Sequence, residues 1–335
     1  MLASETDENS ATTTHSYDQW GNRISTTDPL GRVTTYTYDA VGRVLSQTDP
    51  AGVVTTNTYD LRGRLLTQTT GDLTTTMTYL PTGLLSSVRQ PSGYQISYQY
   101  DAAYRLIGWS DNRGNSGSYV LDAMGNRISE QIHDAQNQLA FQLSRTINIA
   151  INRIASQTVG GNQLSSYRYD ANGDLTSITI GSQSTITYGL DALRRLTTEK
   201  NPLNATATLT YNALNAVTLA KDFKGVTTAY TRDAQGNATQ ESSADIGSQQ
   251  SNYDARGLNS SSQDAAGRSQ QTQRDILGRL TILNASNSTT SLDSSFNYQN
   301  GTDQLSQIQE PHVTTNYQRD NLGRVTRKSQ SIEGN

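Results

Sequence analysis

The sequence predicts an all-β protein in which tandem β-hairpin repeats form one long antiparallel meander, coiled into a curved wall. Three observations carry this prediction. A Tyr-Asp pair recurs at intervals of 21 residues, a second Asp-x-x-Gly string follows ten residues later, and the segments in between are short and rich in Thr, Val, Ile and Tyr. Each repeat therefore contains two strands and two chain reversals.

The first reversal of each repeat begins at the Asp of the Tyr-Asp pair. This position recurs fifteen times, in steps of 21 residues apart from single steps of 20, 27 and 24. Asp occupies eleven of the fifteen positions, and Gly follows three residues later in ten of them. The positions are Asp18, Asp39, Asp60, Leu80, Asp101, Asp122, Ile149, Asp170, Asp191, Asn212, Asp233, Asp254, Asp275, Gln299 and Asp320.

The second reversal has the same residue preference. It is seen in Asp28-Pro29-Leu30-Gly31, Asp49-Pro50-Ala51-Gly52 and Asp264-Ala265-Ala266-Gly267. Asp at the first position and Gly at the fourth, with Pro allowed second, are typical of a type I turn that ends in a left-handed residue. We therefore expect bulged hairpin loops at both ends of every strand pair.

The strands lie between these reversals, for example over 33–38 and 53–59. Both alternating faces carry mainly Thr, Ser, Gln and Asn, so the wall is expected to be polar on both sides and stabilised by ladder hydrogen bonds and cross-strand pairs. Tyr before the Asp and an aliphatic residue after the Gly flank each first reversal, which predicts an aromatic-aliphatic seam. The predicted turn and seam residues are Tyr38, Asp39, Gly42, Tyr59, Asp60, Gly63, Tyr100, Asp101, Leu106, Tyr169, Asp170, Gly173, Tyr253, Asp254, Gly257, Asp275, Gly278, Asp320 and Gly323.

Composition excludes several classes of function. The net charge is −4 with both signs interspersed, and no basic stripe indicates nucleic-acid binding. No apolar run approaches 18 residues, so no membrane span is expected. There is no Cys, and the polar, acidic Met1–Ala11 stretch does not resemble a Sec signal peptide. We expect a polar segment over 1–11 and the repeat array over 12–335.

Tyr-Asp-x-x-Gly-Arg-Leu followed by Asp-Pro-x-Gly at this spacing resembles the YD repeats of bacterial Rhs proteins, of the C components of insecticidal toxin complexes and of teneurins. The resemblance runs from about Tyr17 to Arg327. It implies a hollow β-cage, or part of one, that encloses a C-terminal toxin or an unfolded polypeptide. It also implies a secreted protein, or one that a specialised system delivers from a bacterial cell, whose partners are the rest of its shell and the enclosed cargo.

The resemblance also has gaps. The family closes its shell with a core segment that carries an Asp-Pro-x-Gly-Leu signature, whereas Asp28-Pro29-Leu30-Gly31 and Asp49-Pro50-Ala51-Gly52 sit inside ordinary repeats. We therefore expect the chain to be part of a larger shell. Its terminal strands, near 12–17 and 325–331, are expected to be exposed edges, so that the isolated chain either self-associates through them or is found with the rest of its shell.

No catalytic, cofactor or metal site is predicted, and the chain is not expected to be an enzyme. His15, His133 and His312 are isolated in the sequence, and the turn aspartates are expected to cap turns. The six extra residues near 131–145 and the three near 284–294 predict longer loops, the first with a possible short helix. A surface module that binds glycan or protein through exposed Tyr rows is the alternative function.

Overall fold

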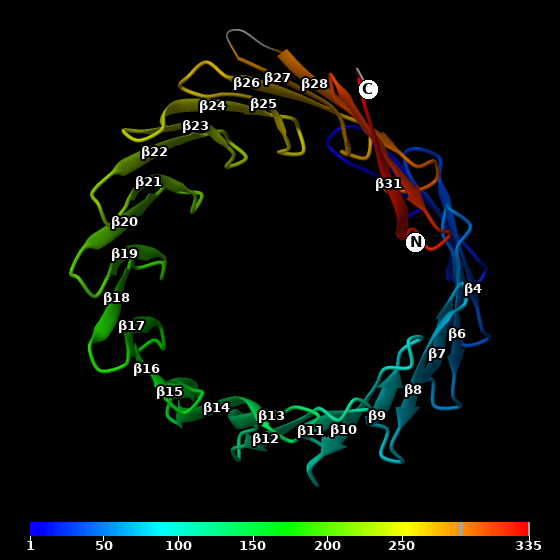
Figure 1. Ribbon diagram of the computed structural model, residues 1–335, viewed down its shortest axis with the longest axis horizontal. Coiled ribbons are helices and arrows are strands. Elements are labelled where there is room, and N and C mark those ends of the chain that lie inside the picture. Colours follow the sequence, from blue (N-terminus) through cyan, green and yellow to red (C-terminus); the bar gives the residue numbers. More distant parts are fainter. Residues whose placement is uncertain (288–290, 334–335) are drawn as a thin grey trace. The chain divides into compact units, whose positions relative to one another are not determined.

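The computed structural model describes residues 1–287 and 291–333, and in these residues it contains 31 strands and no helix (Figure 1). More than half of the residues lie in strands. The strands belong to one antiparallel sheet in which neighbours in the sequence pair with each other. The predicted all-β meander of hairpin repeats is thus confirmed. None of the described residues forms a helix long and apolar enough to cross a membrane.

The chain divides into two compact units. Unit 1 comprises Met1–Leu73 and Thr228–Asn335, called here the N-terminal and C-terminal segments, and unit 2 comprises Thr74–Thr227. Unit 2 carries β8 and the strands after it up to β21, which follow one another along a curved band in Figure 1. Unit 1 carries β1 to β7 and β22 to β31.

The strands of the N-terminal segment are β1 (Ser4–Thr6), β2 (Thr12–Tyr17), β3 (Arg23–Thr27), β4 (Val33–Tyr38), β5 (Val44–Thr48), β6 (Val54–Tyr59) and β7 (Leu65–Thr70). Those of unit 2 are β8 (Leu73–Tyr79), β9 (Leu85–Arg89), β10 (Gln95–Tyr100), β11 (Leu106–Asp111), β12 (Ser116–Leu121), β13 (Arg127–His133), β14 (Leu139–Asn148), β15 (Arg153–Val159), β16 (Gln163–Tyr169), β17 (Leu175–Ile180), β18 (Ser184–Leu190), β19 (Leu196–Lys200), β20 (Thr206–Tyr211) and β21 (Val217–Lys221). Those of the C-terminal segment are β22 (Thr227–Arg232), β23 (Ala238–Ser243), β24 (Gly247–Tyr253), β25 (Asn259–Gln263), β26 (Ser269–Arg274), β27 (Leu280–Ser286), β28 (Ser291–Tyr298), β29 (Leu305–Gln309), β30 (Val313–Arg319) and β31 (Val325–Ile332).

Each first reversal is a bulged hairpin. In the β4–β5 hairpin, Thr37 faces Ser46 and Tyr38 faces Val44, so the register shifts by one residue beside the turn. The same shift places Tyr100 opposite Leu106 and Tyr169 opposite Leu175. The second reversals contain the same turn, with Gly52 at a φ of +83°, but the β5–β6 register continues to the turn without this shift. The shift beside the turn was expected at both reversals, and the β5–β6 hairpin does not have it.

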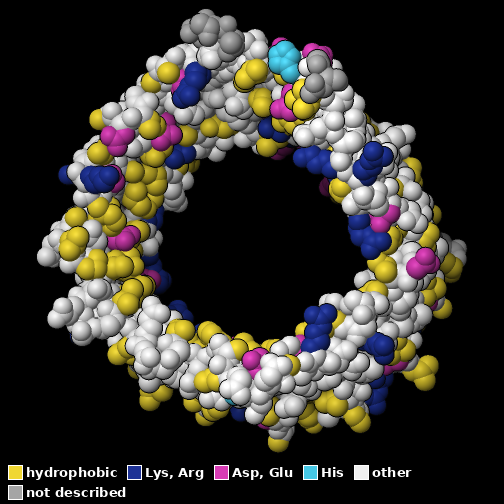
Figure 2. Space-filling model, in the orientation of Figure 1, with side chains coloured by type: hydrophobic (Ala, Val, Ile, Leu, Met, Phe, Trp, Pro, Cys, Tyr) yellow, Lys and Arg dark blue, Asp and Glu magenta, His cyan; other side chains and the backbone are white. Residues whose placement is uncertain are grey.

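The wall has almost no buried core. Among the described residues, only Ala11 and Leu143 are buried hydrophobic side chains. Hydrophobic and polar side chains are interspersed over the face in Figure 2. Cross-strand hydroxyl pairs replace apolar contacts in many places, for instance Thr58 with Thr67 at 2.6 Å. Stability therefore depends on the ladder and on the side-chain ties between repeats.

The two insertions lengthen strands, and the expected long loop at 131–145 is not formed. β13 runs to His133, a tight turn follows at Asp134–Asn137, and β14 starts at Leu139 and continues for ten residues. No helix forms there, because the extra residues extend the ladder and satisfy their backbone groups in it. At the second insertion, β27 ends at Ser286 and β28 begins at Ser291. Residues 288–290 of the predicted loop lie outside the described residues.

Candidate functional site: the repeat turns and a rim contact

The first-reversal turn is organised by its Asp carboxylate. Asp39 Oδ1 accepts hydrogen bonds from the backbone N–H groups of Val41 and Arg43, at 3.0 and 2.9 Å. Its Oδ2 accepts from Arg43 Nε at 2.6 Å, and the Gly42 N–H donates to the Asp39 carbonyl at 3.1 Å. Gly42 has a φ of +81°, a conformation in which a β-branched residue is strained. One carboxylate thus closes the turn and holds the following Arg.

These bonds lower the pKa of the turn carboxyls. The backbone N–H of Arg43 is the main cause of the lowered pKa of Asp39, and the backbone N–H groups of Arg64 and Arg105 do the same for Asp60 and Asp101. A carboxylate that accepts several N–H bonds is stabilised in its charged form. The aspartates are therefore occupied by their own turns.

The Arg at the end of the turn reaches the next repeat. Arg43 Nη1 donates to the Asp60 carbonyl at 3.3 Å, and the Arg43 guanidinium lies 4.8 Å from the centroid of the Tyr59 ring. Arg195 makes the same two contacts with the Asn212 carbonyl and the Tyr211 ring. The first-reversal turns lie along one edge of the wall, called here the first-reversal rim, and the second-reversal turns lie along the opposite edge, the second-reversal rim. Each such Arg therefore fixes one turn to the following turn on the first-reversal rim.

The Tyr of each Tyr-Asp pair reaches back to the preceding repeat. Tyr59 Oη donates to the Val44 carbonyl at 2.9 Å, and Val44 is the cross-strand partner of Tyr38. Tyr100 and Tyr169 donate in the same way to Leu85 and Ile154. Sequence reasoning placed Tyr in a seam with aliphatic neighbours but missed this hydroxyl bond, which the recurring 15-residue separation between donor and acceptor could have revealed.

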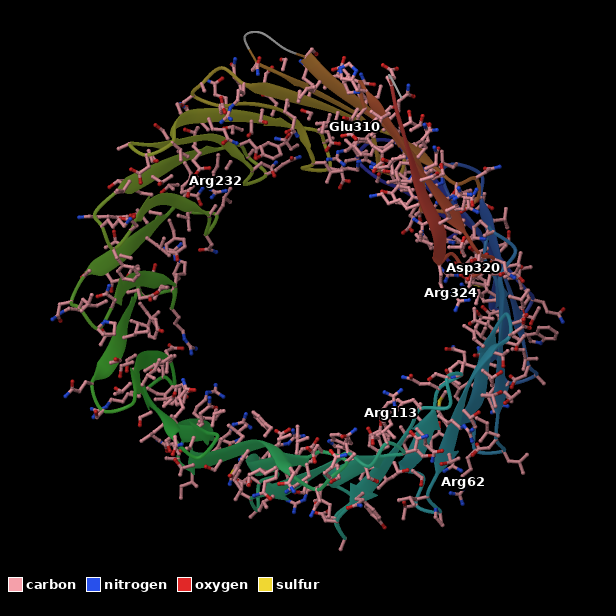
Figure 3. The ribbon with its side chains drawn as sticks, in the orientation of Figure 1. Arg62, Arg113, Arg232, Glu310, Asp320 and Arg324 are labelled. Carbon is pink, nitrogen blue, oxygen red and sulfur yellow. The ribbon has the colours of Figure 1, made fainter. Side chains whose placement is uncertain are left out.

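The remaining predicted turn residues occupy equivalent places. The glycines at positive φ include Gly42, Gly63, Gly173, Gly257, Gly278 and Gly323. The aspartates that cap such turns through the N–H groups two and four residues later include Asp60, Asp101, Asp170, Asp254, Asp275 and Asp320. Asp320 and Arg324 lie beside each other after β30 in Figure 3, with Arg324 Nε 2.7 Å from Asp320 Oδ2.

Two positions differ from the predicted frame. The turn assigned to Ile149 begins instead at Asn148, whose side chain accepts from the Ala150 N–H and whose carbonyl accepts from Ile151. An amide can cap this turn whereas Ile cannot. Residues 1–11, expected to be a polar segment ahead of the repeats, already hold β1 and a turn at Asp7–Ser10 of the same design. β1 pairs with β2, so the expectation that 12–17 is an edge strand was wrong. Asp7 lies 21 residues before Asp28, a signal that was present in the sequence.

Unit 1 brings the two segments together at their turns. The second-reversal turns of the N-terminal segment meet the first-reversal turns of the C-terminal segment, a region called here the rim contact. Arg32 Nη1 lies 3.0 Å from Asp303 Oδ1, and Arg279 Nη1 approaches the same oxygen at 3.2 Å. Near one end of the contact, Arg256 Nη1 lies 3.7 Å from Asp7 Oδ2.

Backbone contact accompanies these charges. A Cβ added to Gly301 would lie 2.9 Å from the Pro50 carbonyl oxygen, and one added to Gly71 would lie 3.0 Å from Leu322 Cδ2. Beside these points is a groove of about 1080 Å³, lined by both sets of turns. The rim contact is therefore close at a few turns and open between them.

The described residues offer little for chemistry. Residues 1–287 and 291–333 contain no group of three or more His, Asp or Glu side chains that could hold a metal ion. The groove beside the rim contact contains Asp28, Asp320, Arg32 and Arg324, which pair within their own turns. The arrangement is suited to joining turns.

Comparisons with known proteins agree with this geometry. The family model described as RHS Repeat matches residues 1–33, 17–54, 38–76, 79–108 and 169–206. No curated protein matches the chain.

Solved structures of similar fold include toxin-complex proteins. One is a crystal structure of TcdB2-TccC3-TEV, with 15% identity, a TM-score of 0.50, and coverage of 96% of this chain and 24% of that one. Another is the Tc holotoxin pore of Photorhabdus luminescens, with 15% identity, a TM-score of 0.47, and coverage of 96% and 23%. This chain thus spans about a quarter of their length. With its recurring Tyr-Asp turns, the chain thus carries repeats of the RHS type over the residues that the family model matches.

Proposed function

We propose that this chain is a structural region of an Rhs-type toxin, forming part of a β-shell that encloses a C-terminal toxin or an unfolded polypeptide. The observation that carries the proposal is the way each repeat is tied to its neighbours, by a Tyr hydroxyl on one side and an Arg on the other. These ties hold together an extended wall that has almost no core of its own. Such a wall is suited to separating two aqueous spaces.

The rim contact supports the same function. A wall that encloses cargo must also be sealed where its turns meet. Arg32 and Asp303 join turns that are far apart in the sequence, and Arg279, in the turn before that of Asp303, pairs with the same carboxylate. Asp303 is 70% exposed although its Arg partners are largely buried, so solvent screens each pair and the contribution of each is at most about 1 kcal/mol. We expect a seal of modest strength, carried by several weak contacts together.

The remaining parts of the proposal follow from the family. The partners would be the rest of the shell and the enclosed polypeptide, the protein would be secreted or delivered from a bacterial cell, and this region would perform no catalysis. The alternative, recognition of glycans through Tyr rows, has little support. All the tyrosines except Tyr104 are at least half-buried, and many hydroxyls already donate to backbone carbonyls.

Limited proteolysis of the natural gene product that contains residues 1–335 tests the proposal. In the intact product we expect the repeats and a segment outside them to resist cleavage. In an Arg32→Glu/Arg279→Glu variant, which places like charges at Asp303, that segment should become cleavable while the strands persist. Arg168→Glu, on the exposed surface of β16, is the matched control. Enclosure would be refuted if the segments outside the repeats were cleaved at the same rate in the folded product as in the unfolded one.

A further inference from the structure

The rim contact shows how turns of this protein recognise one another. Leu322 lies two residues after Asp320, at the tip of a first-reversal turn, and its Cδ2 reaches Gly71 on the opposing rim. The tip residue of a first-reversal turn therefore fits against the second-reversal rim of another segment.

In the N-terminal segment, the residue at the same place in a first-reversal turn is exposed to solvent. Trp20 lies two residues after Asp18, the place that Leu322 has after Asp320, and is 78% exposed. Its backbone N–H donates to Asp18 Oδ1 at 3.0 Å, so the main chain that carries the indole is held by the turn. The neighbouring tip, Val41, is 75% exposed. Large exposed apolar side chains that cluster on one edge mark an interaction surface.

A hollow on the C-terminal segment has the complementary character. It measures about 370 Å³ and lies at the second-reversal rim, lined among others by Asp264, Arg268, Ala285 and Leu292. Leu292 is 57% exposed and supplies apolar surface. The hollow thus offers an aliphatic wall and a guanidinium, the two surfaces on which an indole ring packs.

Arg268 is the uncovered counterpart of a residue in the rim contact. Arg32 and Arg268 each follow their turn Asp by four residues and pair with it, through Asp28 and Asp264. The Arg32 side chain is 15% exposed because it also reaches Asp303, whereas that of Arg268 is 71% exposed. Within residues 1–287 and 291–333, one chain therefore carries both halves of such a contact without a cover.

We propose that Trp20 docks into the Arg268–Leu292 hollow of a second copy of this chain. Trp20 lies on the first-reversal rim of the N-terminal segment, and the hollow lies on the second-reversal rim of the C-terminal segment. These rims are on opposite sides of the rim contact, so Trp20 does not reach the hollow of its own chain. The contact is head-to-tail, and Trp and Arg are the residue types that dominate such interfaces. This inference does not depend on enclosure of cargo.

Trp20 reports on its own burial. The only other tryptophan is Trp109, and Trp109→Phe leaves Trp20 as the sole indole. In this variant we expect the Trp20 emission to shift to the blue, and quenching by acrylamide to fall, as concentration rises over about a hundredfold range. Sedimentation velocity of the unmodified chain should show association over the same range.

Substitutions on each side of the contact distinguish this docking from other modes of association. Trp20→Ser and Arg268→Glu should each weaken association about tenfold or more. Leu219→Asp, on an exposed mid-strand position of β21, should leave it unchanged. A monomer at all concentrations, association that survives Trp20→Ser, or concentration-independent protection of Trp20 would each overturn the proposal, the last by showing that the same chain covers the indole.

Discussion

The repeats of unit 1 fall into two classes that differ in the last residue before the first-reversal turn. This residue is Tyr in one class, called here Tyr-ended, and Arg in the other, called here Arg-ended. In the Tyr-ended repeats, such as the one at Tyr59, the hydroxyl donates to the preceding repeat, at the Val44 carbonyl. In the Arg-ended repeats, the side chain bonds to its own turn, as where Arg274 Nη1 donates to the Gly278 carbonyl at 3.1 Å. Arg319 in addition reaches back to the preceding repeat, where its Nη2 donates to the Leu305 carbonyl at 3.2 Å. The Arg-ended repeats are those at Arg232, Arg274 and Arg319.

The comparison separates two requirements of the repeat. The backbone reversal needs only the Asp cap and the left-handed residue, which both classes share. Coupling between repeats needs a side chain that reaches across to the preceding repeat. The Tyr hydroxyl does this without leaving a buried donor unpaired. Arg274 and Arg319 each leave a buried Nε without a hydrogen-bond partner, and an unpaired buried donor is destabilising. The Arg-ended repeats should therefore be the weaker ones.

The largest effect is expected from the turn glycines. Gly278→Val places a β-branched residue at a φ of +81° and disturbs the carbonyl that Arg274 uses, so it should cost about 1–3 kcal/mol of unfolding free energy. Gly42→Val, in a Tyr-ended repeat, carries the backbone strain without that second loss and should cost less. Urea unfolding measures both. Gly278→Asn is the control, because Asn tolerates this region.

The turn aspartate should matter less than the glycine. Asp275→Ala removes the cap on the N–H groups of Leu277 and Arg279 and should cost about 0.5–2 kcal/mol, as for other capping residues. The same urea titration compares it with Gly278→Val. Equal costs for the two substitutions would mean that the left-handed backbone is not the main constraint at the turn.

Removing a Tyr hydroxyl should uncouple two repeats. Tyr59→Phe retains the ring against Arg43 but loses the bond to Val44, and should cost about 0.5–1.5 kcal/mol. Hydrogen exchange should show faster opening of the β4–β5 hairpin, which the bond ties to β6. A Tyr59→Phe variant with unchanged exchange would show that the remaining contacts are enough to couple the repeats, among them the Asn57 Nδ2 bond to the same carbonyl at 3.1 Å.

The reverse substitution sharpens the comparison. Arg274→Tyr removes a buried guanidinium with an unpaired Nε and restores the Tyr-Asp pair, so we expect stability equal to the present chain or up to about 1 kcal/mol greater. Thermal unfolding measures the difference, with Arg274→Met as a control that removes the charge without supplying a hydroxyl. A clear loss of stability in Arg274→Tyr would indicate that the Arg tie to its own turn is essential there.

The sequence predicted local features better than distant ones. The spacing of Asp and Gly was sufficient for the hairpins, because a turn depends on four or five consecutive residues. It failed at Ile149, where Asn148 caps the turn, and at Asp7, where Ser10 takes the place of Gly at a φ of +64°. Nothing in the sequence pointed to the rim contact. Its position depends on twist accumulated over many strands, and small differences in twist per strand decide which turns meet.

The smallest difference between the two classes is expected in acid. The pKa values of Asp39, in a Tyr-ended repeat, and of Asp320, in an Arg-ended one, are both lowered from 3.8, by the backbone N–H of Arg43 and by the Arg324 side chain respectively. A carboxyl whose folded pKa is lowered stabilises the fold above its unfolded pKa, and this contribution disappears as pH falls through the folded pKa. Both turns should thus lose protection below about pH 4. Hydrogen exchange of the segments around Gly42 and Gly323, with rates corrected for the intrinsic effect of pH, measures this. Loss in only one class would show that the residue before the Asp, and not the shared carboxylate, sets the acid stability of the turn.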